Sequence, residues 1–354
     1  MKINFLHITF FVAIIIFGFS FSNKKFSDPN KEKLLIEVVK YVVEKGHYNS
    51  IEIDDGISEK IFNSYIEQLD NQKRFFLQSD IRQFEKYKFK LDDQLKDHDL
   101  TFFDLVFQVS RERIDEVKDY YYDIMEKGFD FSSDENIDLD FENKSFARSK
   151  NEIKNRWRKQ LKYSTLDILT LKLGDSIKII DNKTLDESMS LIKKNTEDFF
   201  DYVSEMDRDD WFANYINAFL NQLDPHTVYF NPDDKDRFDT NISGKFNGIG
   251  ARLQKTEGAV KIVDIIVGGP IWKDKLLDIG DIILKVAQEN EDPVDIIGMN
   301  LDDAIKLIKG PADSVVKLTV KKIDGEIKDV SIKRGLVELE ELYAKSTLIS
   351  KNNK

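Results

Sequence analysis

The chain has 354 residues, a length that predicts about two or three domains. Hydrophobic residues make up 41% and charged residues 33%, a balance that allows folded cores and argues against a disordered chain. The net charge of -12 argues against nucleic acid as the main partner, and the absence of cysteine excludes disulfides, thiolate nucleophiles, cysteine metal sites and a lipid-modified N-terminal cysteine.

The first residues of the chain have the pattern of an export signal. Lys2 supplies a positive charge, and the run from Phe5 to Phe21 is almost wholly apolar. Small residues suited to cleavage lie in Gly18-Phe19-Ser20 or Ser20-Phe21-Ser22. We predict a signal peptide at residues 1–22 that is removed, with an uncleaved membrane anchor as the alternative. Either outcome places the rest of the chain outside the cytoplasm, in the periplasm or on the extracytoplasmic face of the membrane.

From about residue 28 to 230 the apolar residues recur every three or four positions, as in helices. The clearest stripe covers roughly seven turns of one helix and comprises Phe103, Phe107, Ser110, Ile114, Val117, Tyr121 and Ile124. Similar patterns predict helices at Leu34–Val43, Ile57–Leu69, Ile153–Leu171, Leu185–Val203 and Trp211–Leu220. Gly128–Lys144, rich in Asp, Ser and Asn, predicts a long loop. We therefore expect an all-helical domain at residues 28–230, packed through these stripes.

The pattern changes to β-strands in the last third of the chain. Val260–Ile266 and Val315–Val320 are β-branched runs, and Asp324-Gly325 predicts a hairpin turn between two strands. The fold class is therefore an all-helical domain followed by a small mixed α/β domain at residues 238–336, with the junction near residues 230–243.

Several short motifs follow one another in the small domain. The glycine loop Asn247-Gly248-Ile249-Gly250 precedes a strand, and Gly268-Gly269-Pro270 opens a short helix. Asn300 caps a second helix, which Gly310-Pro311 ends. In this order the motifs resemble a PDZ module, whose groove captures chain ends. The residues predicted to bind a peptide C-terminus, through backbone N–H groups and an apolar wall, are Gly248, Ile249, Gly250, Ala251, Leu253, Ala304, Ile305 and Ile308.

Other chemistries lack their required residues. Gly244-Lys245 is followed by Phe246 and not by Ser or Thr, so a P-loop is excluded. The histidines form no H-E-x-x-H motif, and we interpret His226, in a turn, as a packing or hydrogen-bonding residue. Segments that begin at Asp207 and Asp234 lack the Gly and Glu of a calcium loop. No catalytic residue, metal site or cofactor is predicted.

Longer segments resemble one enzyme family. Leu69–Ile81 and Arg158–Tyr163 are similar to the helical N-terminal domain of the tail-specific proteases, also called C-terminal processing peptidases. Leu223–Phe230 resembles the linker that leads to their PDZ module, and Gly244–Ile308 resembles that module itself. The resemblance therefore covers about residues 30–340 and implies a helical domain followed by a PDZ domain.

The resemblance also implies a function. Members of the family are exported serine endopeptidases that bind apolar C-terminal ends of proteins and cleave them with a serine nucleophile and a lysine base. Their catalytic core follows the PDZ module, so residues 337–354 are expected to be a truncated segment leading toward an absent core. Ser346 and Ser350, beside Lys345 and Lys351, are not expected to be catalytic. Whether this chain is itself an enzyme stays open.

The expected function is thus the substrate-recognition portion of a tail-specific protease, present as a fragment or truncated product. A non-catalytic exported PDZ adaptor is the alternative, and a docking scaffold that uses the helical domain is a third possibility. The expected partners are C-terminal ends of protein substrates and an envelope lipoprotein adaptor. Nucleic acid is not expected, and membrane contact is expected only through an uncleaved signal segment.

Overall fold

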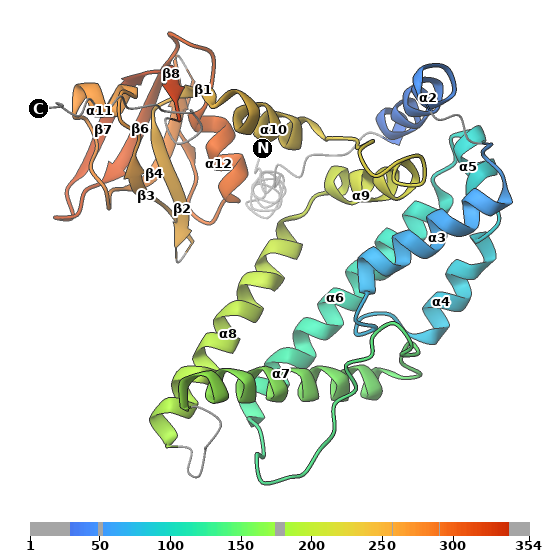
Figure 1. Ribbon diagram of the computed structural model, residues 1–354. Coiled ribbons are helices and arrows are strands. Elements are labelled where there is room, and N and C mark those ends of the chain that lie inside the picture. Colours follow the sequence, from blue (N-terminus) through green and yellow to red (C-terminus); the bar gives the residue numbers. More distant parts are fainter. Residues whose placement is uncertain (1–28, 49–51, 174–180, 257, 290, 340–354) are drawn as a thin grey trace, which may run out of the picture. The chain divides into compact units, whose positions relative to one another are not determined.

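The computed structural model describes residues 29–339 apart from 49–51, 174–180, 257 and 290. The chain divides into two compact units, which we call the helical unit, up to Tyr229, and the second unit, from Phe230. The predicted signal peptide at 1–22 and all but the first residues of the predicted segment 337–354 lie outside the described residues. The predicted fold class, a helical domain followed by a small mixed domain, is confirmed (Figure 1).

The helical unit is built from helices joined by turns and one long loop. Their bounds are α2 Pro29–Gly46, α3 Asp55–Asp70, α4 Gln78–Phe84, the 3-10 helix η1 Glu85–Tyr87, α5 Leu91–Asp97, α6 Thr101–Lys127, α7 Lys150–Leu173, α8 Asn182–Glu205 and α9 Arg208–Leu220. Every helix predicted from apolar spacing is present, and the predicted long loop separates α6 from α7. The short helices α4, η1 and α5 were not predicted.

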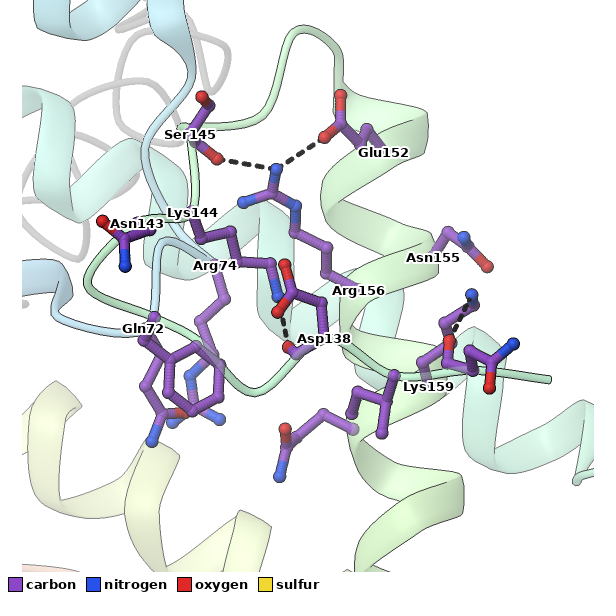
Figure 2. A pocket seen from close by; sticks show the side chains of 14 residues that line it. Gln72, Arg74, Asp138, Asn143, Lys144, Ser145, Glu152, Asn155, Arg156 and Lys159 are labelled. Atoms are coloured by element: carbon purple, nitrogen blue, oxygen red, sulfur yellow. Dashed lines mark hydrogen bonds and ion pairs between the residues drawn. The ribbon is translucent and has the colours of Figure 1, made fainter.

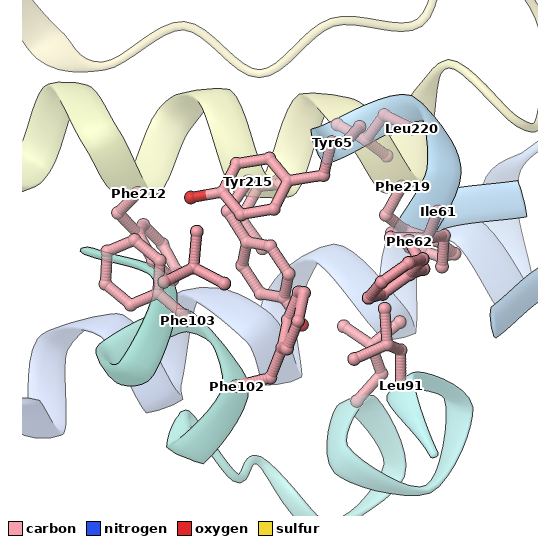
Figure 3. Packing of buried hydrophobic residues seen from close by; sticks show 14 of the residues in the cluster. Ile61, Phe62, Tyr65, Leu91, Phe102, Phe103, Phe212, Tyr215, Phe219 and Leu220 are labelled. Carbon is pink, nitrogen blue, oxygen red and sulfur yellow. The ribbon is translucent and has the colours of Figure 1, made fainter. Parts of the chain in front are cut away.

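Aromatic side chains form the core where α3, α6 and α9 pack together (Figure 3). The ring of Tyr215 lies 5.3 Å from that of Tyr65 and 5.6 Å from that of Phe103, centroid to centroid. Such pairs stabilise a core by about 0.5–1.5 kcal/mol each beyond the burial of their area. Further along α6, Tyr121 packs in a second cluster with Trp157 of α7. The long apolar stripe of α6 is therefore a packing surface, as predicted.

The loop between α6 and α7 is held against α7 by charged side chains. Glu135 accepts hydrogen bonds from Arg158 and from Lys162, whose Nζ lies 2.8 Å from the Glu135 carboxylate. Lys162 is 6% exposed, so this pairing also balances a buried charge. At the far end of the loop, the backbone N–H of Gln78 donates to the carbonyl of Ala147 at 2.8 Å. The loop therefore has a defined position although none of its described residues lies in a helix or strand.

We expect Glu135→Gln to remove part of the acid sensitivity of the helical unit. Hydrogen bonds from Arg158 and Lys162 lower the pKa of Glu135 from 4.5 to about 2. A depressed carboxyl pKa stabilises the folded state above the unfolded pKa, and this contribution is lost as pH falls through the folded pKa. The variant should therefore be less stable than the parent at neutral pH, and the difference should shrink as pH falls toward 2 and vanish below it, as measured by urea unfolding.

The exposed loop residue Glu142 provides the control, because Glu142→Gln should leave the same pH profile unchanged. Parallel stability curves for the parent and Glu135→Gln would contradict the assignment.

The second unit is a small antiparallel sheet protein. Its elements are α10 Pro232–Ser243, β1 Lys245–Gly248, β2 Ala251–Thr256, β3 Ala259–Ile265, α11 Pro270–Asp274, β4 Ile282–Gln288, β5 Val294–Asp295, α12 Leu301–Ile308, β6 Val315–Lys321, β7 Ile327–Lys333 and β8 Gly335–Glu338. The main sheet has the order β2-β3-β4-β6-β7, with β5 paired to β4, while β1 pairs with β8 in a separate ribbon. The predicted strands, short helices and hairpin turn at Asp324-Gly325 are confirmed.

The predicted junction at residues 230–243 is itself mostly a helix, α10. The side chain of Asn231 accepts a hydrogen bond from the backbone N–H of Asp234 at 2.8 Å, and Pro232 occupies the first turn. Gly244, in a left-handed conformation, ends the helix. Asp234 therefore belongs to a helix terminus, which is consistent with a capping role and not a metal loop.

Candidate functional site

A groove of about 570 Å³ runs along β2, at the edge of the main sheet, with α12 on its opposite side. The predicted residues that line it are Gly248, Ile249, Gly250, Ala251, Leu253, Ile305 and Ile308. Ala304 is fully buried in the core between α12 and the sheet, and it does not line the groove. An edge strand leaves a row of backbone groups without a partner strand, so β2 can accept one more strand.

The glycine loop is fixed to the start of α11 and to the segment that precedes it. The carbonyl of Gly250 accepts a hydrogen bond from the N–H of Ile266 at 2.9 Å, and that of Ile249 accepts from Ile271 at 3.1 Å. Gly250 has a φ of +84, and a Cβ on it would lie 3.0 Å from the Cα of Gly269. Both glycines are therefore required by a close approach of two backbones, in addition to the left-handed dihedral at Gly250.

Two backbone donors remain open at this loop. Within the described part of the chain, the N–H groups of Ile249 and Gly250 donate to no carbonyl or side chain. Both residues line the groove, at the end where β1 leads into β2. Unpaired backbone N–H groups that lie close together bind anions, carboxylates among them. The loop therefore has the chemical capacity to hold a carboxylate.

Capping groups at both ends hold α12, the opposite wall of the groove. The side chain of Asn300 accepts from the N–H of Asp302 at 2.7 Å, as predicted. At the other end the guanidinium of Arg334 donates to the carbonyls of Ile308 at 2.8 Å and Leu307 at 3.0 Å. Arg334 is only 2% exposed, and burial lowers its pKa. The last carbonyls of α12, which lack partners within the helix, thus accept hydrogen bonds from a buried cation.

Several groove residues were not predicted because they come from distant parts of the chain. Phe246 lies in β1, and Leu339 directly follows β8. Both line the groove because β1, near the start of the second unit, pairs with β8, near its end. Lys309 also lines the groove, and its Nζ lies 5.1 Å from the centre of the Phe246 ring. Arg252 and Gln254 of β2 also line the groove and could have been found from their place on the strand. The contribution of the ribbon could not have been found in this way.

The turn that contains His226 is organised by a different histidine. Nε2 of His47 lies 2.8 Å from Oδ2 of Asp224 and 3.0 Å from Oγ1 of Thr227. His226 is exposed, and its backbone N–H donates to Asp224 at 2.7 Å. His226 is therefore a hydrogen-bonding residue, one of the two roles predicted for it, but the bond is made by its backbone, and His47 supplies the imidazole of this turn.

Two further properties concern the described residues only. Among them, no three His, Asp or Glu side chains gather in a way that could bind a metal ion. None of the helices formed by these residues combines the length and hydropathy of a membrane span.

Comparisons with known proteins agree with the two-unit architecture. Residues 38–233 match the family model of the tail-specific protease N-terminal domain, and residues 240–321 match the PDZ domain model. The tail-specific protease of Haemophilus influenzae is 31% identical over 305 residues, which are 86% of this chain and 42% of that protein. The carboxy-terminal processing protease CtpA of Bacillus subtilis is 32% identical over 145 residues, 41% of this chain and 30% of that protein.

One solved structure is similar to part of the chain. It is the PDZ domain of a carboxy-terminal protease from Vibrio cholerae in complex with peptide, which is 43% identical and covers 27% of this chain and 99% of its own, with a TM-score of 0.26. This chain spans less than half the length of either curated relative. Because the N-terminal domain model alone covers more than half of the residues and the PDZ model follows directly, the chain belongs to the tail-specific protease family.

Proposed function

We propose that this chain is the substrate-recognition portion of an exported, periplasmic tail-specific serine endopeptidase, and that its PDZ groove binds apolar C-termini of proteins. The observation that supports the proposal is the pair of N–H groups on Ile249 and Gly250, which have no acceptor among the described residues and lie at one end of a groove along an edge strand. A C-terminus brings the three features that match this site: a carboxylate, an extended backbone and a last side chain.

Each part of the peptide has a counterpart in the groove. The terminal carboxylate accepts hydrogen bonds from the N–H groups of Ile249 and Gly250, and the peptide backbone pairs with β2. The last side chain enters the space bounded by Ile305 and Ile308 of α12. Lys309 adds a positive charge to a chain whose net charge is -12, which otherwise repels a carboxylate.

Ile305→Asp is the variant that tests the groove. Ile305 is half-buried and lines the groove, whereas Ile249 is 3% exposed and belongs to the core, so its replacement would also disturb folding. A carboxylate at residue 305 would lie beside the apolar side chain of the ligand and repel its C-terminus. We expect affinity for a labelled peptide with an apolar C-terminal residue to fall by at least about tenfold, measured by fluorescence anisotropy.

Ile323→Asp is the matched control, because Ile323 is 74% exposed in the same unit and does not line the groove. Amidation of the peptide C-terminus should weaken binding to the parent by a comparable factor. Equal binding of the free and amidated peptides would contradict the carboxylate site. Unchanged affinity in Ile305→Asp would show that the peptide binds outside this groove.

The proposed cleavage step is assigned to no residue of this chain. In the family it requires a serine nucleophile and a lysine base, and a protease core encoded in frame downstream of this sequence would support the proposal. The competing function is an exported PDZ adaptor that holds C-termini without cutting them, which unrelated downstream sequence would favour. Cell fractionation tests the proposed export, and crosslinking in the envelope tests the proposed lipoprotein partner.

A further inference from the structure

A polar pocket of about 460 Å³ lies in the helical unit, away from the groove residues in sequence and in a different unit. Its walls come from the turn after α3, from the long loop between α6 and α7, and from α7 itself. Figure 2 shows Lys144 entering from the loop and Arg156 from α7, with Arg74 contributed by the turn. The pocket is thus a place where three separate segments converge.

The pocket concentrates positive charge in an acidic protein. Its basic residues are Arg74, Lys144, Arg156 and Lys159, and its acidic residues are Asp138 and Glu152. Two positive charges are therefore in excess, although the whole chain carries -12. Fields of this sign in a concave site attract anions.

Part of this charge is used by the fold. Arg156 donates to the carboxylate of Glu152 at 2.6 Å and to the carbonyls of Lys73 and Ser145. Glu152 also accepts from the backbone N–H of Arg148 at 2.9 Å. Arg156 therefore fastens the loop to the helix.

Arg74 has the most donors to offer. Its Cζ lies 4.4 Å from the centre of the Trp157 ring, and Nε1 of Trp157 donates to the carbonyl of Arg74 at 2.9 Å. Among the described residues, no hydrogen bond or ion pair involves its guanidinium, although the charge of Asp70 acts on it. Stacking on the ring fixes the guanidinium plane and leaves its N–H edge available. Beside it, the buried Oε1 of Gln72 also has no hydrogen-bond partner in the described chain.

The two lysines are bonded only to neutral groups. Nζ of Lys144 donates to the backbone carbonyl of Asp138 at 2.9 Å, and Nζ of Lys159 donates to that of Asn136 at 2.8 Å. Each ammonium has three donors, so each retains some for a ligand. Burial and the positive charge of Arg156 lower the pKa of Lys144, and burial lowers that of Arg74. A bound anion would relieve both effects.

We propose that this pocket binds a phosphate dianion, either as the free ion or as a phosphomonoester. The lining residues carry more positive than negative charge, as the binding of a dianion requires. Its oxygens accept from the guanidinium of Arg74 and from the ammonium groups of Lys144 and Lys159, which reach the pocket from three different segments. Binding therefore joins the α3–α4 turn, the long loop and α7, and it stabilises the helical unit. The proposal does not depend on peptide binding by the second unit.

The test is a titration of the whole chain with inorganic phosphate at constant ionic strength. Calorimetry gives the affinity. We expect saturable binding in the parent, at least about tenfold weaker binding in Arg74→Gln, and no change in Arg111→Gln, an exposed arginine of α6. If Arg74→Gln fails to fold, Lys159→Gln takes its place, with Lys154→Gln on the same helix as control.

Further titrants identify the source and the charge of the ligand. Glycerol 3-phosphate that binds more tightly than inorganic phosphate indicates a phosphomonoester, and the reverse order indicates the free ion; both support the site. Acetate that binds as tightly as phosphate overturns the assignment to a dianion. The absence of saturable binding, or an equal loss in the pocket variant and its control, overturns the site itself.

Discussion

Replacing Arg334 by Met is expected to lower the free energy of unfolding of the second unit by about 2–4 kcal/mol. The guanidinium donates to the carbonyls of Leu307 and Ile308, to Oε1 of Gln288 at 2.6 Å and to Oγ of Ser314 at 2.9 Å. Methionine fills a similar space but leaves these buried acceptors without their donors. Because the two carbonyls end α12, the last turn of the groove wall should open and peptide affinity should fall.

Hydrogen exchange of the α12 and β4 amides measures this effect within the second unit. Arg237→Met is the matched control, since the Arg237 side chain is 51% exposed and pairs with Asp234 and Asp302 on the surface of the same unit. Exposed ion pairs contribute about 0–1 kcal/mol. Similar exchange in the two variants would show that Arg334 does not support α12.

A comparably large loss of stability is expected for Gly250→Ala, by about 2–5 kcal/mol. A left-handed dihedral costs a residue with Cβ about 1–2 kcal/mol. The new methyl would also lie 3.0 Å from the Cα of Gly269, and overpacking of this kind typically adds about 1–3 kcal/mol. The Cα of Gly269 cannot be moved by a rotamer change, so the contact can be relieved only if the backbone of the loop moves. The N–H groups of Ile249 and Gly250 would then lose their alignment, and peptide binding should be lost.

Gly258→Ala separates the two causes. Gly258 has a φ of +78, close to that of Gly250, but nothing lies within 4 Å of its added Cβ. This control should therefore cost only the dihedral term and leave peptide binding intact. Hydrogen exchange of β3 gives the stabilities, and fluorescence anisotropy gives the affinities. Equal losses in the two variants would show that the approach of Gly269 has no energetic consequence.

Local patterns predicted most of the fold. The stripe of α6 predicted a packing surface because helical periodicity depends only on residues a few positions apart, and both core clusters do lie along it. The short helices α4 and α5 each span about two turns, too little for an apolar period to be recognised. Helix α10 was overlooked although its signals are local: Asn231, Pro232 and Gly244 mark its start and its end.

The candidate site was predictable in part, for the same reason. The glycine loop and α12 are local motifs, but which face of α12 meets the groove depends on packing, and Ala304 lies on the core side. Gly310 shows a deeper limit. Its backbone is not in the left-handed conformation that glycines adopt where they end helices. A glycine is needed there because a Cβ would lie 2.9 Å from the guanidinium of Arg334. The need for this glycine thus originates in a residue beyond two further strands, which no local pattern reveals.

The ribbon of β1 and β8 has a mechanical consequence. Lys245 pairs with Glu338 and Gly248 with Gly335, so the chain enters and leaves the main sheet region at one end of an antiparallel ribbon. Tension applied through the flanking chain therefore peels the strands apart one pair at a time, beginning with the ion pair of Lys245 and Glu338 at 2.7 Å. Such unzipping resists pulling far less than shearing, in which all bonds are loaded together. The ribbon would therefore yield to such a load before the main sheet does.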